Sequence, residues 1–269
     1  MKGKKAGVVL VVLVLLIRLG LSLLPPMAID QGAWRAWSAR MTEIGPAKFY
    51  SPDYFSDNPP GFLYVFWFLG EIKNKFFPAL SYFSPGFDFL LKLPNNLADL
   101  ATGGLIYLLL KRKTGEKWAR TGFLFYTLNP VVIFNSSIFG QFDASGTLFA
   151  VLAIYAMGIY KRPELAGFFF AVSWAIKPQA IVLAPVLGLF FLLSAKPKKW
   201  LTTGLTILGT TLLIYWPFFP TNPASGVFYV AQKMAKLYTC TTCYAFNFWG
   251  LWGNWQNDTN LFLGLPFIL

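Results

Sequence analysis

The sequence has no histidine and only two cysteines among its 269 residues. Histidine is the usual general base and a common metal ligand, so a general base in this chain must be a carboxylate, a lysine, a tyrosine or a thiolate. The cysteines form one C-T-T-C, Cys240 and Cys243, and a lone pair cannot supply the four ligands of a structural zinc site. On the outer side of a membrane, the pair is as consistent with a local disulfide as with two free thiols.

Charged residues are also scarce, at 13% of the chain, whereas hydrophobic residues make up 56% and aromatic residues 19%. This composition is not that of a soluble domain and predicts an integral membrane protein. About 20 apolar residues cross the hydrocarbon core, and residues 6–24 supply such a stretch with one charge, Arg18. A cleaved signal peptide would be shorter and would end at a small-residue cleavage site, so we expect a retained anchor.

The net charge of +12 comes from basic residues in short clusters between the apolar segments. Nucleic-acid binding would favour one continuous basic stripe, so no nucleic-acid partner is expected. By the positive-inside rule the clusters lie on the cytoplasmic side, and so does the N-terminus. The clusters are Lys2, Lys4 and Lys5; residues 111–113 with Lys117 and Arg120; Lys161 and Arg162; and Lys196, Lys198 and Lys199.

The apolar segments predict an all-α polytopic membrane protein with a single domain, residues 1–269, and long outer-face loops that carry interfacial helices. Trp34, Trp37, Met41 and Ile44 recur at helical spacing, which predicts an amphipathic helix lying at the interface. Residues 61–70 suit a second interfacial or re-entrant helix. The transmembrane candidates are 6–24, 87–110, 122–139, 143–160, 165–176, 181–194, 201–215 and a partial 261–269, and the outer loops are 25–86 and 216–260.

Some of these segments are too short to cross a membrane as single straight helices. The pair 165–176 and 181–194 has short arms, so we expect a broken or sunken hairpin. The last segment stops after roughly a third of a spanning length, so C-terminal helices of the bundle are apparently missing.

Most acidic residues fall on the outer half of this topology, since only Glu116 and Glu164 of the 11 lie beside cytoplasmic clusters. This asymmetry favours chemistry on the outer face. Asp30 follows the apolar residues 27–29, where partial desolvation raises a carboxyl pKa and makes a better base; the alternative role is an N-cap. Residues 57–60, Asp-Asn-Pro-Pro, read as the start of a helix with proline in its first turn.

Four other polar residues lie at positions where a membrane protein usually keeps such residues only for a structural or functional role. Gln141 and Asp143 lie in a tight outer turn, where they either bind an acceptor hydroxyl or cap the following helix. Asp99 lies inside a predicted span and needs a partner, for which Lys92 and Arg18 are candidates. Lys177 separates two apolar arms; its partner is a lipid phosphate, Asp99 or Asp143, unless it only snorkels to the interface.

A succession of short motifs runs from residue 30 to residue 249. They are Asp30 with Trp34, Trp37, Gly45 and Tyr50; Asp57-Asn58-Pro59-Pro60-Gly61 with Tyr64 and Trp67; Lys92-Leu93-Pro94; Ala98-Asp99-Leu100; Leu128-Asn129-Pro130; Gly140-Gln141-Phe142-Asp143-Ala144; Lys177-Pro178-Gln179; and Asn247-Phe248-Trp249. This succession resembles the GT-C superfamily of polytopic glycosyltransferases, especially bacterial relatives of the second GPI-anchor mannosyltransferase and, more distantly, ALG-type glucosyltransferases.

The resemblance implies a GT-C-type transmembrane bundle in the plasma membrane of a prokaryote, with the active site on the outer face. It also implies that an acidic residue of the first outer loop is the catalytic base, and the matching position is Asp30. The family's proline motif usually has tyrosine where this chain has Asn58. The implied partners are a polyprenyl-phosphate sugar donor, a glycan, lipid or protein acceptor, and the bilayer.

The sequence hypothesis is therefore inverting transfer of a mannose- or glucose-like hexose, with Asp30 as base. The carrier has one phosphate to stabilise as it leaves, so no metal or other cofactor is expected. Trp34, Tyr244 and Trp249 are stacking candidates for sugar rings, although interfacial anchoring explains each equally well. The cation candidates are Lys177, Arg35, and Lys233 or Lys236, and the other predicted substrate-binding residues are Asp57, Gln141, Asp143, Gln179 and Asn247.

Two other functions stay open on the sequence. A transporter or flippase of lipid-linked sugars would also carry polar groups and broken helices, but it should place its charges near the midplane of paired repeats. A non-catalytic membrane subunit is the other alternative, because of the missing C-terminal helices.

Overall fold

The computed structural model describes residues 2–194, 196–237, 240, 250–251, 253, 257, 259, 261–262 and 265–266. These residues are almost entirely helical, apart from the antiparallel pair of two-residue strands β1 (Leu261–Phe262) and β2 (Leu265–Pro266). The predicted helical architecture is thus confirmed for the helices within residues 2–237. The partial transmembrane helix predicted at 261–269 is wrong in its described residues, because 261–262 and 265–266 pair as strands. In the described ranges, no single helix has the length and apolarity to cross a membrane, but the bent pair Glu116–Thr127 and Pro130–Phe139, with a 46° angle, passes that test together.

The first of two helical arms contains α1 (Lys2–Leu21), α4 (Pro85–Thr114) and α5 (Glu116–Thr127). The α4–α5 turn is made by Gly115, whose φ of +86° favours glycine. After α5 the chain continues as α6 (Pro130–Ile133) and the π-helix η2 (Phe134–Phe139). The helix predicted over the candidate span 122–139 is therefore interrupted, because Pro130 lacks an N–H and Asn129 caps a new helix by accepting a bond from the N–H of Val131.

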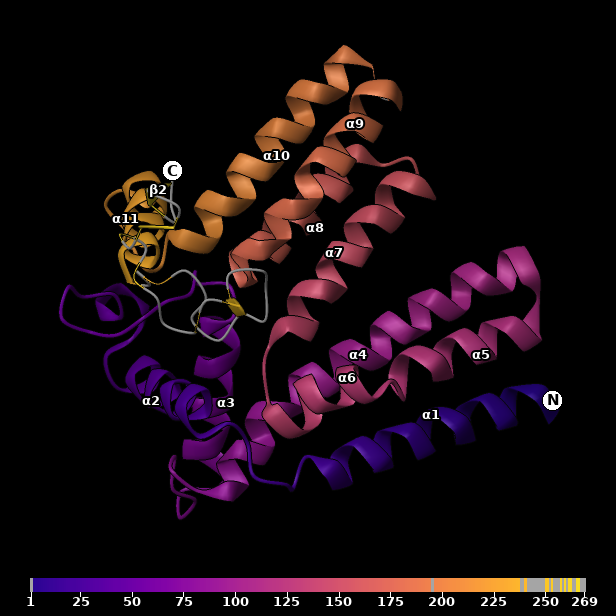
Figure 1. Ribbon diagram of the computed structural model, residues 1–269, viewed down its shortest axis with the longest axis horizontal. Helices are drawn as coiled ribbons and strands as arrows, with labels where there is room; N and C mark the ends of the chain where they lie inside the picture. The colour runs from indigo at the N-terminus through magenta and orange to yellow at the C-terminus, as the bar shows by residue number, and fades with distance from the viewer. Residues whose placement is uncertain are drawn as a thin grey trace.

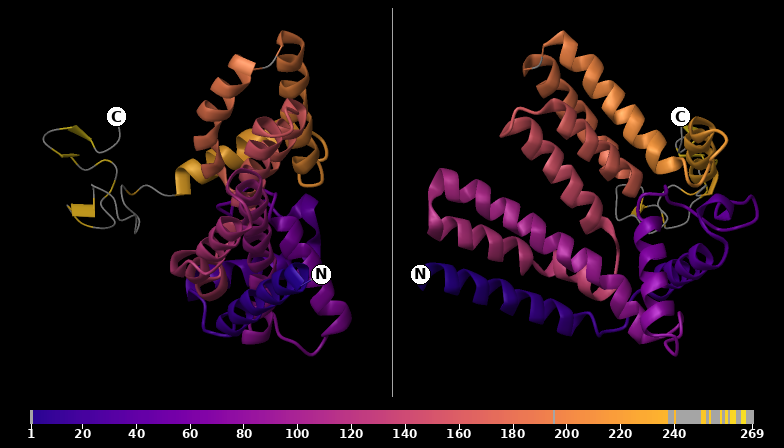
Figure 2. Two further views of the ribbon diagram at one scale, coloured as in Figure 1. Left: turned by 90° about the vertical axis from the view of Figure 1, so that its right-hand side faces the viewer. Right: turned by 180° about the vertical axis from the view of Figure 1, so that it is seen from behind.

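The second arm contains α7 (Asp143–Gly158), α8 (Pro163–Ile176), η3 (Pro178–Leu183), α9 (Ala184–Ser194) and α10 (Pro197–Tyr215). Figure 1 shows this arm diverging from the first, and the view from behind in Figure 2 agrees. The chain breaks between α8 and η3 at Pro178, which confirms the broken hairpin that the sequence predicted.

A base of shorter helices joins the arms: α2 (Ala28–Ile44), η1 (Pro46–Lys48), α3 (Leu63–Phe76) and α11 (Pro223–Leu237) (Figure 1). The apolar face of α2 packs against α3, with Trp34 and Trp37 only 4% and 2% exposed in an aromatic cluster that includes Phe66. The apolar stripe of the predicted interfacial helix thus faces protein, which the sequence could not reveal because a protein-facing stripe has the same period as a lipid-facing one.

A buried polar network ties the first arm to the base. The Arg18 guanidinium is completely buried; it forms an ion pair with Asp99 and donates to the Thr127 carbonyl at 2.8 Å. Lys92 instead donates to the Ser22 and Leu24 carbonyls, at 3.0 and 2.7 Å. The partner of Asp99 is therefore Arg18, one of the two predicted candidates, and Lys92 fixes the connection between α1 and α2.

Candidate active site

Asp30 lies in the first turn of α2, where the arms meet the base. The N-cap of α2 is Met27, which has no capping side chain, so the alternative role of Asp30 as an N-cap is wrong. The Asp30 carboxylate instead accepts a hydrogen bond from the amide of Gln141, a residue 111 positions later in the chain. The fold thus brings two of the predicted site residues into direct contact.

Backbone hydrogen bonds hold the segments of this region together. The N–H of Met27 donates to the carbonyl of Phe139 at 3.2 Å, which joins the start of α2 to the end of η2. The N–H of Gly61 donates to the carbonyl of Ala175 at 2.8 Å, which joins the proline-containing loop to the end of α8. These bonds place residues 57–61 beside residues 175–177. A Cβ on Gly61 would lie 2.5 Å from that carbonyl oxygen, so only glycine permits the approach.

The loop before α3 differs from its predicted form. Helix α3 begins at Leu63, and Pro59 and Pro60 are buried in the turn before it, so the predicted helix start with proline in its first turn is wrong. The side-chain amide of Asn58 donates to the Asp57 carboxylate at 2.6 Å, and the backbone carbonyl of Asn58 accepts a bond from the Tyr50 hydroxyl at 2.8 Å.

The charges of Asp57, Asp143 and Lys177 all act on Asp30. Desolvation by burial is the largest influence on its carboxyl pKa and raises it, and the negative charge of Asp57 raises it further. Lys177 and the Gln141 hydrogen bond act in the opposite direction, and Asp143 adds a smaller upward contribution. The net result is a pKa above the ordinary value, which suits a carboxylate that must accept a proton.

Lys177 is held at the break between α8 and η3. Its ammonium lies 2.9 Å from the Asp143 carboxylate and 4.4 Å from the centre of the Phe142 ring. The side chain keeps 17% of its surface exposed, so the cation is fixed but still accessible. Of the predicted partners, the structure brings Asp143 to Lys177, and Asp143 also accepts a bond from Asn135 at 3.4 Å.

A cavity of about 500 Å3 begins at these charges and follows α7. Asp143, Lys177 and Gln179 form its polar end. Its other lining residues are Gly146, Thr147, Ala150, Val151, Ile154, Ser173, Ala180 and Leu183, most of them apolar. The volume lies within the range of about 300–1,000 Å3 that is usual for ligand pockets. The cavity can therefore hold an amphipathic molecule with its anionic group at Lys177.

Several predicted residues do not join this cluster. Arg35 forms a two-point ion pair with Asp88, and no described contact links it to Asp30. Trp34 is buried in the aromatic cluster, so its predicted stacking on a sugar is wrong. Lys233 donates to the Ser51 and Tyr54 carbonyls and supports that loop. The predicted Tyr244, Asn247 and Trp249 lie outside the described residues, as does Cys243, whereas Cys240 is disulfide-bonded.

Sequence reasoning missed Gln31, which is completely buried next to Asp30. Neither polar atom of its amide has a hydrogen-bond partner among the described residues, and its oxygen would lie 2.8 Å from a Cβ on Gly140. The sequence signal that could have identified Gln31 as a site residue is its position directly after Asp30. Among the described residues, no group of three or more Asp, Glu or Cys side chains is arranged to hold a metal ion.

Comparison with known families places the chain in the GT-C superfamily of glycosyltransferases. Residues 57–221, more than half of the chain, match the family described as dolichyl-phosphate-mannose-protein mannosyltransferase, and the chain belongs to that family. No individual curated protein matches it. Members of the family are integral membrane proteins and glycosyltransferases that use a polyprenyl-phosphate sugar. The matched range contains Asp57, Gln141, Asp143 and Lys177, whereas Asp30 precedes it.

Proposed function

We propose that the chain is an integral membrane enzyme that transfers a hexose, mannose- or glucose-like, from a polyprenyl-phosphate carrier to an acceptor hydroxyl, with Asp30 as general base. The observation that carries this proposal is that Asp30 accepts a hydrogen bond from Gln141 and lies within electrostatic reach of Lys177, which lines the polar end of a mostly apolar cavity.

Transfer begins when the Asp30 carboxylate accepts the proton of the acceptor hydroxyl. The acceptor oxygen then forms a bond to the anomeric carbon while the bond from that carbon to the phosphate oxygen breaks, with inversion. Asp30 is suited to this step because burial and Asp57 raise its pKa, and a base with a raised pKa accepts a proton more readily. The hydrogen bond from Gln141 fixes one carboxylate oxygen, which orients the other.

Lys177 stabilises the leaving group. The donor is a phosphodiester with one negative charge, and its departure as a phosphomonoester adds a second. A fixed cation favours the state with more negative charge, and removal of one such group commonly costs about 100- to 1,000-fold in rate. The first isoprene units of the carrier then follow the apolar wall formed by Ala150, Val151 and Ile154 of α7.

The distribution of charge supports an outer-face active site. The basic clusters of the sequence fall at the α4–α5 turn, after α7 and before α10, which are the ends of the arms away from the base (Figure 1). The N-terminus lies at such an end too. By the positive-inside rule these ends face the cytoplasm, which puts Asp30 on the opposite side.

The test is transfer of radiolabelled sugar by the purified full chain in detergent, from synthetic polyprenyl-phosphate mannose and glucose to a panel of hydroxyl acceptors. We expect Asp30→Asn to lose at least about 100-fold in rate, the usual loss when a general base is removed. The matched control, Asp53→Asn, changes an exposed acid of the same outer segment and should keep wild-type activity. Full activity in Asp30→Asn would remove Asp30 from the mechanism, and no transfer by the wild type would refute the proposal.

The melting temperature separates a catalytic from a structural role. Because folding raises the pKa of Asp30, its favourable contribution to stability exists below the unfolded pKa and is lost as pH rises through the folded pKa. At neutral pH the ionised carboxylate therefore opposes folding. We expect Asp30→Asn to melt at or above the wild-type temperature, so a lower value would indicate a structural role.

A further inference from the structure

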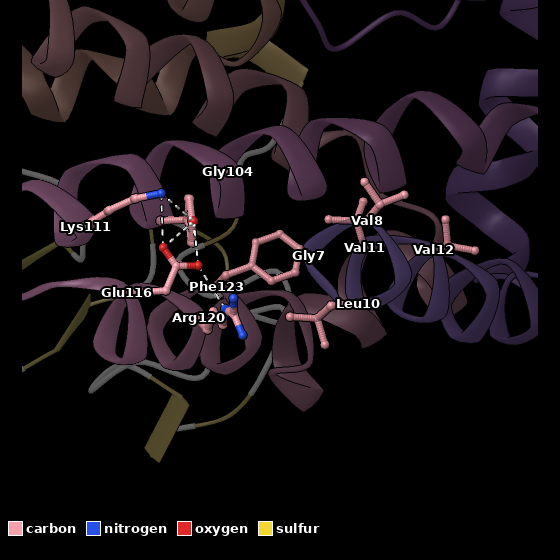
Figure 3. Close-up of a pocket in the computed structure, with 11 residues that line it drawn as sticks. Gly7, Val8, Leu10, Val11, Val12, Gly104, Lys111, Glu116, Arg120 and Phe123 are labelled. Carbon is pink, nitrogen blue, oxygen red and sulfur yellow. Dashed lines mark hydrogen bonds and ion pairs between the residues drawn. The ribbon is translucent and has the colours of Figure 1, made fainter. Parts of the chain in front are cut away.

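A second cavity lies far from Asp30, between the cytoplasmic halves of α1, α4 and α5. It measures about 820 Å3, within the usual size of ligand pockets. Its wall on α1 is formed by Gly7, Val8, Leu10, Val11 and Val12. Figure 3 shows these residues at one end and the charged side chains of α4 and α5 at the other. The cavity is thus amphipathic along its length.

The polar end is a cluster of three side chains around Glu116. Lys111 and the Arg120 Nε lie 3.0 and 2.9 Å from its carboxylate, and the Tyr107 hydroxyl donates to both oxygens at 2.9 Å. Both carboxylate oxygens of Glu116 therefore have hydrogen-bond donors. Arg120 uses only its Nε, so its two Nη groups have no hydrogen-bond partner among the described residues.

Positive charge exceeds negative charge at this end. Residues 107–120 contain the five bases Lys111, Arg112, Lys113, Lys117 and Arg120, and one acid, Glu116. Helix α1 starts nearby with three lysines within residues 2–5. A second copy of the chain would bring the same excess of bases to this surface and would be repelled. An anionic occupant is favoured instead.

The other end offers an apolar surface with room beside it. Val8, Val11 and Val12 are 64%, 42% and 46% exposed. Gly7 and Gly104 face open space, since an added Cβ at either position meets no atom within 4 Å. Two glycines without neighbours leave a gap between the helices that a hydrocarbon chain can fill.

We propose that this cavity binds an anionic phospholipid of the cytoplasmic leaflet, with its phosphate at Arg120 and Lys111 and one acyl chain between α1 and α4. Basic pockets between transmembrane helices on the cytoplasmic side commonly bind anionic headgroups. The inference rests on the membrane orientation in the proposed function but not on the transfer chemistry or on Asp30.

The experiment measures lipid retention by the purified full chain in mild detergent. The protein is incubated with equal amounts of phosphatidylglycerol and phosphatidylcholine, and the bound lipids are counted by native mass spectrometry. We expect phosphatidylglycerol to be preferred, and the preference to fall as salt is raised. Equal retention of the two lipids by the wild type would overturn the proposal.

Charge variants test the headgroup contact. Arg120→Gln should weaken retention of phosphatidylglycerol about fivefold, the effect expected for one cation at an anionic lipid. Glu116→Gln should strengthen it by a similar factor, because it removes the competing anion from Lys111 and Arg120. Neither variant should change retention of phosphatidylcholine. A Glu116→Gln variant that loses phosphatidylglycerol would contradict the assignment.

A volume variant tests the acyl-chain contact. Gly104→Leu puts its Cβ in open space and replaces glycine in a helix, so the chain should still fold. It should lose both lipids, whereas the control Gly188→Leu, which also enters open space on α9, should retain them. If Gly104→Leu retains both lipids as the wild type does, or changes its oligomeric state instead of its lipid retention, the proposal fails. Sugar transfer is assayed on the same preparations, so the two proposals fail separately.

Discussion

Substitutions that break the buried ion pair between Arg18 and Asp99 should be among the most destabilising in the first arm. Their side chains are 0% and 2% exposed, and the Asp99 carboxylate also accepts a bond from the Tyr126 hydroxyl at 3.2 Å. Replacing Asp99 by Asn leaves the Arg18 cation without a counter-charge while keeping the shape of the site. Leaving one charge of a buried pair unpaired typically costs about 3–5 kcal/mol of unfolding free energy.

The assay is a double-mutant cycle of Arg18→Met and Asp99→Asn, with unfolding followed by circular dichroism in mixed detergent and dodecyl sulfate micelles. The double variant should be less destabilised than the sum of the two single variants by roughly 0.5–3 kcal/mol, the range seen for contacting groups. The control is Glu164→Gln, which breaks the ion pair between Glu164 and Lys199. These two side chains are 31% and 52% exposed, so the variant should lose less than about 1 kcal/mol of unfolding free energy. An Asp99→Asn cost as small as that of the control would refute the reasoning.

Two further predictions concern the candidate active site. Asp57→Asn should move the acidic limb of the pH profile of kcat/KM to lower pH, because the charge of Asp57 raises the pKa of Asp30; Lys177→Gln should move it to higher pH, because that cation lowers the same pKa. Shifts in the same direction would contradict this assignment. Gly61→Ala should lower both the melting temperature and the transfer rate, since its Cβ would lie 2.5 Å from a backbone oxygen of α8, whereas Gly32→Ala, which enters open space on α2, should lower neither.

Much of the helical architecture could be predicted from the sequence. Apolar length and the basic clusters defined most helices to within a few residues, and Pro178 indicated the break after α8. The packing partner of each helix could not be predicted in the same way. The spacing of Trp34, Trp37 and Met41 defines an apolar stripe, but the stripe is the same whether lipid or α3 covers it. Only long-range contacts decide between the two.

The candidate site shows the same division between local and long-range information. An acid before a helix is consistent with an N-cap or a base, and local sequence leaves both open for Asp30. The structure excludes the N-cap role, because α2 begins two residues earlier, at Ala28, and it shows that Gln141 donates to the Asp30 carboxylate. The role of Asp30 as a base is part of the proposed function. Lys177 was identified as an isolated cation from its apolar flanks, but its pairing with Asp143 depends on how α7 packs against α8.

Helix α4 connects the two proposed sites. Its 30 residues span about 45 Å at 1.5 Å per residue, more than the hydrocarbon thickness of about 30 Å. Asp88 near its start pairs with Arg35 of α2, Asp99 in its middle pairs with Arg18 of α1, and Lys111 near its end lines the cavity between α1, α4 and α5. Each of these charges forms an ion pair with a residue of another helix, and the partner of Lys111 is Glu116 of α5. The same helix that fixes α1 and α2, and with them the position of Asp30, therefore also forms a wall of the proposed lipid site. A lipid bound there would contact both α1 and α4 and would add to the stabilisation of their packing by the ion pair between Arg18 and Asp99.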